Sequence, residues 1–124
     1  MRKYVEKSET LGQFEQLVLT AVHSLGDGAY GVPIHAKVSE MSGKVVNTGS
    51  IYVALDRLSE KGMLSSTYSD PTPERGGKAR RFYRLEPQGQ RALRDALDTA
   101  RRMSEAIEES PWKLGKLGSK RQRT

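Results

Sequence analysis

Two stretches of the sequence carry side chains that can bind an oxyanion. Residues 47–53, NTGSIYV, bring hydroxyls and small side chains together at Thr48, Gly49, Ser50, Tyr52 and Val53. Residues 75–81, RGGKARR, gather cations around a glycine pair, at Arg75, Lys78, Arg80 and Arg81. Hydroxyls donate and accept hydrogen bonds, and guanidinium groups pair with phosphates or carboxylates. Together the two stretches predict a polyanionic partner.

Catalytic and metal chemistry are not indicated. The chain has no cysteine, which excludes disulfides and thiolate metal sites. Its two histidines, His23 and His35, fall on different predicted helices, so we expect no metal site. Acidic and basic side chains mix over 91–109, which is typical of a solvated helix face rather than an acid–base dyad. We therefore expect no enzyme activity, no metal ion and no cofactor.

Residues 26–31, GDGAYG, match the glycine spacing of a dinucleotide-binding loop. That loop requires a preceding strand and an acidic residue about 20 positions later. Here a helical pattern precedes the glycines, and residues 46–52 contain no acid. The glycines are better explained by a turn between two helices.

Length and charge fit one small basic domain. The chain has 124 residues and a net charge of +6, and 35% of its residues are hydrophobic. The positive excess falls in two blocks, 70–84 and 113–124. No apolar run is long enough to span a membrane and no signal-peptide pattern opens the chain, so we expect a cytoplasmic protein without a membrane partner.

Apolar periodicity predicts three helices in the first half of the chain. The first starts near Thr10, whose spacing to Gln13 fits a capping box, and ends at the following glycines. The second starts near Val32. The third starts after Asn47, a good N-cap, and ends at Gly62. The stripe that this third helix buries is formed by Ile51, Ala54, Leu55 and Leu58.

A hairpin and a long helix are predicted to follow. Residues 63–69 and 81–86 alternate as short strands around a polar loop with prolines and glycines. The last helix starts at Pro87 or Gln88 and runs to about residue 109. Its apolar seam consists of Leu93, Ala96, Leu97, Ala100, Met103 and Ile107. The predicted fold is mainly α with a small β-hairpin, a winged helix-turn-helix with an added C-terminal dimerisation helix.

The first turns of the third helix have the composition of a helix that enters the DNA major groove. Thr48 and Ser50 can bond base edges or phosphates, and Val53 can touch a thymine methyl. The helix terminus adds free N–H groups and a positive dipole end. A cationic hairpin beside this helix suits the sugar-phosphate backbone or the minor groove, so double-stranded DNA is the favoured partner. The helix residues assigned to DNA contact are Thr48, Gly49, Ser50, Tyr52, Val53 and Arg57.

The seam of the last helix predicts a homodimer. A monomer would expose Leu93, Leu97, Met103 and Ile107 together, and burying one leucine-sized side chain is worth about 1.5–3 kcal/mol. Pairing with a second copy is favoured over folding of the seam onto its own core. A twofold dimer would place two recognition helices about 34–36 Å apart, which predicts an inverted-repeat site.

The sequence resembles the PadR family of transcriptional regulators in three motifs. These are AYGVPIHAKV at 29–38, NTGSIYVALDRLSEKGML at 47–64 and KARRFYRLEPQGQRAL at 78–93. They occur in the family's order and spacing, and the resemblance covers about residues 10–95. It implies a winged-helix domain, dimerisation through a C-terminal helix and repression at a palindromic operator. The single long C-terminal helix is similar to that of the smaller members.

The expected organisation is a winged helix-turn-helix at 1–86, a dimerisation helix at 87–110 and a basic, mobile tail at 111–124. The expected function is a homodimeric repressor that binds specific DNA. The alternative is a winged-helix protein-interaction module without specific DNA binding. Trp112 could stack on an aromatic effector, although packing at a helix end is favoured. The sequence identifies no effector.

Overall fold

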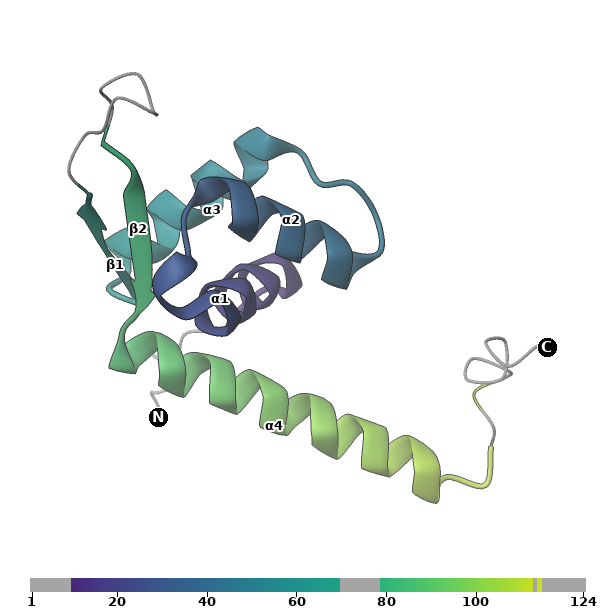
Figure 1. The fold of residues 1–124 in the computed structure, drawn as a ribbon. Coiled ribbons are helices and arrows are strands. Elements are labelled where there is room, and N and C mark those ends of the chain that lie inside the picture. Colours follow the sequence, from purple (N-terminus) through teal and green to yellow (C-terminus); the bar gives the residue numbers. More distant parts are fainter. Residues whose placement is uncertain (1–9, 70–78, 113, 115–124) are drawn as a thin grey trace.

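A computed structural model describes residues 10–69, 79–112 and 114. It contains four helices, one 3-10 turn and two strands, arranged as a winged helix with a long C-terminal helix (Figure 1). In chain order they are α1 (Gln13–Leu25), η2 (Gly26–Gly28), α2 (Gly31–Ser42), α3 (Thr48–Glu60), β1 (Leu64–Tyr68), β2 (Arg81–Leu85) and α4 (Pro87–Glu109). The mainly helical fold with a hairpin is confirmed. No helix in the described part of the chain is long and apolar enough to cross a membrane.

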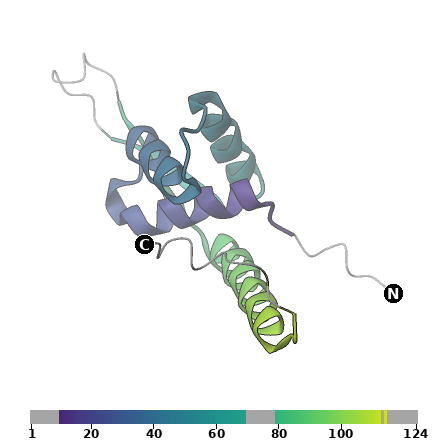
Figure 2. The ribbon, with the colours of Figure 1, turned by 90° about the vertical axis from the view of Figure 1, so that its right-hand side faces the viewer.

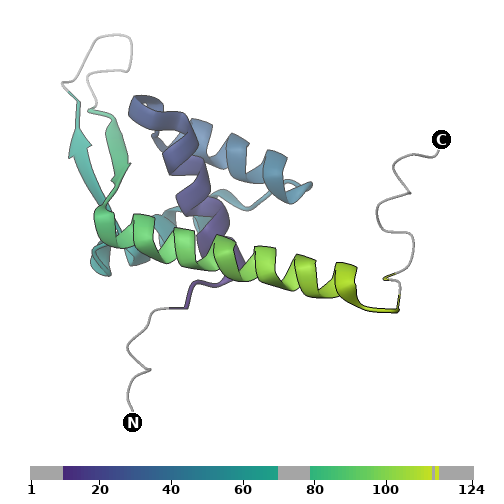
Figure 3. The same cartoon turned by 90° about the horizontal axis from the view of Figure 1, so that it is seen from below.

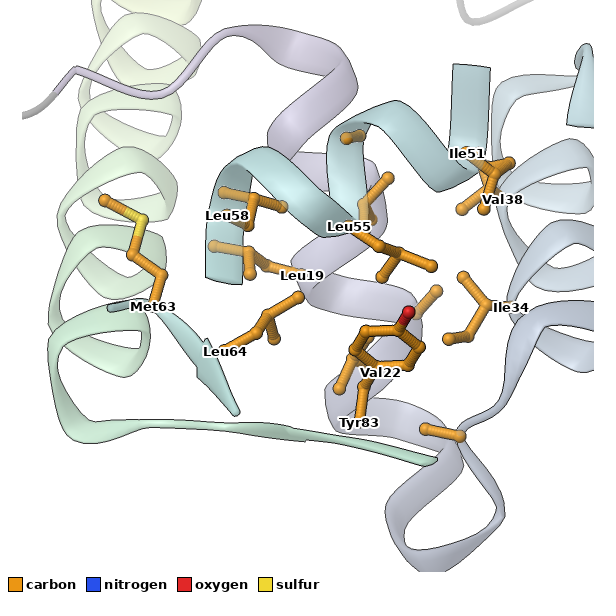
Figure 4. Close-up of a cluster of buried hydrophobic side chains, with 14 of the residues drawn as sticks. Leu19, Val22, Ile34, Val38, Ile51, Leu55, Leu58, Met63, Leu64 and Tyr83 are labelled. Atoms are coloured by element: carbon orange, nitrogen blue, oxygen red, sulfur yellow. The ribbon is translucent and has the colours of Figure 1, made fainter. Parts of the chain in front are cut away.

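One core joins the three N-terminal helices to the hairpin. The predicted stripe of α3 is buried in full, at Ile51, Ala54, Leu55 and Leu58. Figure 4 shows Ile51, Leu55 and Leu58 meeting Leu19, Ile34 and Tyr83, which come from α1, α2 and β2. Figure 2 shows α1 lying between α4 and the pair formed by α2 and α3. The core therefore holds α3 with its buried stripe inward and its opposite face toward solvent.

The start of α1 differs from the prediction. The helix begins at Gln13, and Gly12 rather than Thr10 occupies the N-cap position. The Gly12 N–H donates to Glu15 Oε1 at 3.1 Å, and the other Glu15 oxygen lies 3.2 Å from Lys61 Nζ. Because Glu15 serves both contacts, it fixes the first turn of α1 and also ties it to the end of α3.

Hydrogen bonds in the turn before α3 fix the direction of that helix. The N–H of Val46 donates to Ser39 Oγ at 3.1 Å, and the carbonyl of Val46 lies 2.6 Å from His35 Nε2, which donates to it. Asn47 then caps the helix by accepting the Ser50 N–H at 3.1 Å, as predicted. At the other end Gly62 adopts a φ of 80°, the left-handed conformation that ends helices most easily at glycine.

The hairpin is fastened to the helices by the segment between η2 and α2. β1 and β2 pair antiparallel, with Leu64 opposite Leu85 and Tyr68 opposite Arg81. The Tyr83 N–H donates to the carbonyl of Ala29 at 2.8 Å, so this segment extends the sheet along the free edge of β2. The turn predicted from GDGAYG is present. It also anchors the hairpin of β1 and β2, which is the wing of the winged helix.

The first half of α4 belongs to the core, and the second half leaves it. Gly89 lies so close to the hairpin that a Cβ there would stand 2.9 Å from Leu85 Cδ1. Leu93 is only 7% exposed, which contradicts the expectation that a single chain exposes it. Ala96 also packs against the core, whereas Leu97, Met103 and Ile107 are 53%, 58% and 44% exposed. Figures 1 and 3 show α4 starting beside the hairpin and running away from it beneath α1.

The predicted packing of Trp112 at a helix end is wrong for a single chain. Its side chain is 80% exposed, and Leu114 two residues later is 57% exposed. The backbone N–H of Trp112 donates to Ser110 Oγ at 3.0 Å, just after α4 ends. This apolar pair therefore extends the exposed surface of the second half of α4.

Candidate nucleic-acid interface

The N-terminal turn of α3 is open to solvent. Thr48, Gly49 and Ser50 are exposed, and Asn47 holds the first turn in place. Figure 1 shows this end of α3 on the same side of the domain as the open ends of β1 and β2, opposite α4. Free backbone N–H groups and two hydroxyls thus face outward beside the wing. The arrangement presents hydrogen-bond donors and acceptors without a charged side chain in the first turn.

The following turns of α3 carry the larger predicted contacts. Val53 is 54% exposed and Tyr52 is 44% exposed, and Arg57 is exposed as well. Tyr52 does not extend freely outward, because its ring lies against Gly31 at the start of α2. A Cβ at position 31 would stand 2.7 Å from Tyr52 Cζ and closer still to the hydroxyl oxygen. Tyr52 is therefore held between the two helices of the helix-turn-helix.

Arg80 lies just before β2, at the loop end of the hairpin. Its guanidinium Cζ lies 4.0 Å from the ring centroid of Tyr30, a cation–π contact. The Tyr30 ring meets Phe82 edge-on at 5.3 Å. The Ser69 N–H donates to the Arg80 carbonyl at 2.8 Å and the Arg80 N–H donates to Ser69 Oγ at 3.0 Å, which closes the hairpin. Arg80 is half-buried in this stacked position and borders a hollow between α3 and the hairpin.

Arg81 is more constrained than the sequence suggested. Its Nε donates to Ser66 Oγ at 3.0 Å across the hairpin, and its Nη1 lies 3.8 Å from Asp56 Oδ1 on α3. Its Cζ also lies 5.1 Å from the Tyr83 ring. Burial raises the pKa of Tyr83, and the nearby Arg81 guanidinium lowers it to a smaller extent. The predicted wing cations Arg75 and Lys78 lie outside the described residues.

A hollow of about 470 Å³ separates α3 from the wing. Its wall includes Tyr30 and Gly31 before and at the start of α2, Tyr52 and Asp56 on α3, and Arg80 and Arg81 on the wing. Of the predicted DNA-contact residues, Tyr52 on α3 and Arg80 and Arg81 on the hairpin border this hollow, whereas the first turn of α3 lies outside its lining. Tyr30 and Asp56 were not predicted as part of it. Their place depends on how the hairpin docks against the helices, which no local sequence pattern encodes.

Within the described ranges, no group of three or more histidine, cysteine or acidic side chains is arranged to hold a metal ion. The hollow is instead lined by the Tyr52 hydroxyl and the Asp56 carboxylate on α3 and by the guanidinium groups of Arg80 and Arg81 on the other side.

Three helices, a hairpin and an exposed third-helix terminus define a winged helix-turn-helix protein. The sequence pattern of the transcriptional regulator PadR-like family matches residues 19–95, which is more than half of the 124 residues. The chain therefore belongs to the PadR-like family of DNA-binding transcriptional regulators. No curated protein matches the sequence.

Solved structures of similar fold include several members of this family. A PadR family regulator from Clostridium difficile R20291 is 24% identical, with a TM-score of 0.64 over 79% of this chain and 97% of that one. A PadR-like transcription factor from Bacteroides fragilis is 23% identical, with a TM-score of 0.66 over 79% and 89%. At these identities the likeness shows the fold alone. RosR from H. salinarum is 29% identical, with a TM-score of 0.58 over 73% and 74%.

Proposed function

We propose that the chain is a sequence-specific DNA-binding repressor that acts as a homodimer on an inverted-repeat operator. The observation that carries the proposal is the exposed first turn of α3, with Thr48, Gly49 and Ser50 on the same side of the domain as the open end of the wing. A helix terminus of this kind fits the major groove, because its hydroxyls and N–H groups can reach base edges and phosphates.

The two walls of the interface have different roles in this proposal. Residues of α3 read bases, with the Ser50 hydroxyl and the Val53 methyls nearest to the groove floor. Arg80 neutralises a backbone phosphate, which strengthens binding to every duplex alike. Tyr52 and Arg57 contact the backbone on either side of the groove. Arg75 and Lys78, which lie outside the described residues, add two positive charges to the chain segment between β1 and β2 and are proposed to bind phosphates as well.

The second half of α4 is the proposed dimer contact. Leu97, Met103 and Ile107 leave a line of apolar side chains exposed, and Ala100 between them allows close approach of a second helix. Leu93 and Ala96 serve the core of their own chain and fix the direction in which α4 projects. In this proposal the winged-helix domain includes the start of α4, because Leu93 and Ala96 pack against its core, and the dimer contact begins at Leu97 rather than at residue 87. In the same proposal, the basic residues of the tail at 111–124 add positive charge that strengthens binding to any DNA duplex.

The assignment as a repressor rests on the family resemblance. DNA selection tests the other parts of the proposal, which are sequence-specific binding, the homodimer and the inverted-repeat operator. Duplexes with a randomised segment are bound to the purified protein, recovered and sequenced. We expect an inverted repeat whose half-site centres lie about 10–10.5 base pairs or a multiple of that apart. Two protomers per duplex are expected by mass measurement, and an operator placed over a promoter is expected to lower transcription. Enrichment of no sequence would leave the protein-interaction module as the better account.

A further inference from the structure

We infer that Asp56 competes with DNA phosphate for Arg81 and so limits the affinity of the protein for DNA. The inference rests on the proposed DNA-binding surface and adds to it a residue that weakens binding. It concerns the ion pair between α3 and the wing, in which Asp56 Oδ1 and Arg81 Nη1 lie 3.8 Å apart.

The ion pair is open to exchange. The side chain of Asp56 is 62% exposed and that of Arg81 is 36% exposed, so water and salt reach both groups. Exposed pairs of this kind are weak and screened by salt. A DNA phosphate, which binds a guanidinium at least as well as a carboxylate does, can therefore take the place of Asp56.

Arg81 does not depend on Asp56 for its position. Ser66 Oγ accepts a hydrogen bond from Arg81 Nε at 3.0 Å, and the guanidinium lies over the Tyr83 ring at 5.1 Å. These contacts come from the hairpin itself, to which Arg81 belongs. Removing the carboxylate of Asp56 should therefore leave the guanidinium where it is and free its Nη1 edge.

In the proposed complex the pair also lies next to the nucleic-acid backbone. Asp56 and Arg81 both border the hollow between α3 and the wing, together with Tyr52 and Arg80. A duplex held by the first turn of α3 and by the wing brings phosphates to this hollow. Asp56 then opposes binding in two ways, because it occupies Arg81 in the free protein and repels phosphate in the complex.

The opposite role for Asp56 is positioning of the wing. If the ion pair held the hairpin in place for DNA, removing Asp56 would weaken binding. The geometry favours competition, because the register of β1 with β2 and the bond from Tyr83 N–H to Ala29 fix the hairpin without Asp56. The two roles predict changes of opposite sign.

The test measures the dissociation constant of the purified full-length protein for its selected operator and for an unrelated duplex, at several salt concentrations. Wild type is compared with Asp56→Asn, with Arg81→Gln and with the double variant. Asp98→Asn is the matched control, because Asp98 pairs with Arg101 on α4 at 3.6 Å, far from the wing. Thermal unfolding checks that each variant is folded.

We expect Asp56→Asn to tighten binding about threefold to tenfold on both duplexes at low salt, and to steepen the salt dependence by about one phosphate contact. When Arg81 is replaced by Gln, the gain in affinity from Asp56→Asn should fall to less than half of its value in the wild-type protein. The control Asp98→Asn should leave the dissociation constants unchanged. Weaker or unchanged binding by Asp56→Asn overturns the inference, as does an equal gain with and without Arg81. Failure of the wild-type protein to bind any duplex would instead overturn the proposed function and the inference with it.

Discussion

The phenol ring of Tyr52 on α3 lies directly against the backbone of Gly31 at the start of α2. A Cβ at position 31 would stand only 2.7 Å from Tyr52 Cζ, so this close approach requires glycine. Gly31 is buried and Tyr52 is 44% exposed, which places the contact at the rim of the hollow beside the wing. Gly31 thereby fixes both the spacing of α2 and α3 and the direction of the Tyr52 hydroxyl.

Gly31→Ala should destabilise the fold and weaken DNA binding. The added methyl must displace Tyr52, and overpacking of this kind costs about 1–3 kcal/mol. Urea unfolding measures the loss. The double variant with Tyr52→Ala removes the collision, so its loss should be smaller than the sum of the two single losses. Strictly additive losses would show that the two residues do not interfere.

Substitutions of the apolar residues of α4 should fall into two groups, one that lowers the stability of the domain and one that disrupts the dimer. Leu93→Ala should lower the free energy of unfolding by about 2–5 kcal/mol, because Leu93 is buried in its own domain. Ile107→Lys should leave the fold of the domain intact and shift the protein from dimer to monomer, because Ile107 is exposed beyond the domain. Sedimentation analysis and urea unfolding distinguish the two. A dimer that survives both Ile107→Lys and Leu97→Lys would contradict the proposed contact.

Stability should fall at alkaline pH through Tyr83. Burial raises the pKa of Tyr83 above its ordinary value of 10.0, so the folded state holds the phenolic proton more tightly than the unfolded state does. This contribution is fully present below pH 10 and is lost as pH rises through the folded pKa. Urea unfolding between pH 9 and 11 should show a decline that is smaller in Tyr83→Phe. Equal declines in the two proteins would assign the effect to other groups.

Helix α3 was predictable from the sequence because every signal for it is local. Asn47 caps it, Ile51 and Leu55 belong to a stripe of helical period, and Gly62 ends it, all within one short segment. The start of α1 was missed because a spacing rule favoured Thr10, whereas the Glu15 side chain selects Gly12. Competing local caps cannot be ranked without knowing where the carboxylate points.

The features that were not predictable depend on contacts between distant segments. The ion pair of Arg81 with Asp56 requires the hairpin to dock on α3, and the packing of Arg80 on Tyr30 requires the segment before α2 to join the sheet. Leu93 was placed at the dimer contact because a periodic seam does not reveal which surface covers each residue. The core of its own domain covers Leu93.

The central claim is that the first turn of α3 reads bases while the wing binds the phosphate backbone. The most direct test is the salt dependence of affinity for the operator and for an unrelated duplex, measured with wild type, Ser50→Ala and Arg80→Ala. We expect the logarithm of wild-type affinity to fall linearly with the logarithm of salt, with a slope of about −0.9 per phosphate contact. Arg80→Ala should weaken both duplexes alike and reduce the slope by about one contact, and Ser50→Ala should reduce the preference for the operator with little change in slope. Affinity that is independent of salt, or a Ser50→Ala variant that keeps the full preference while Arg80→Ala loses it, would contradict the account.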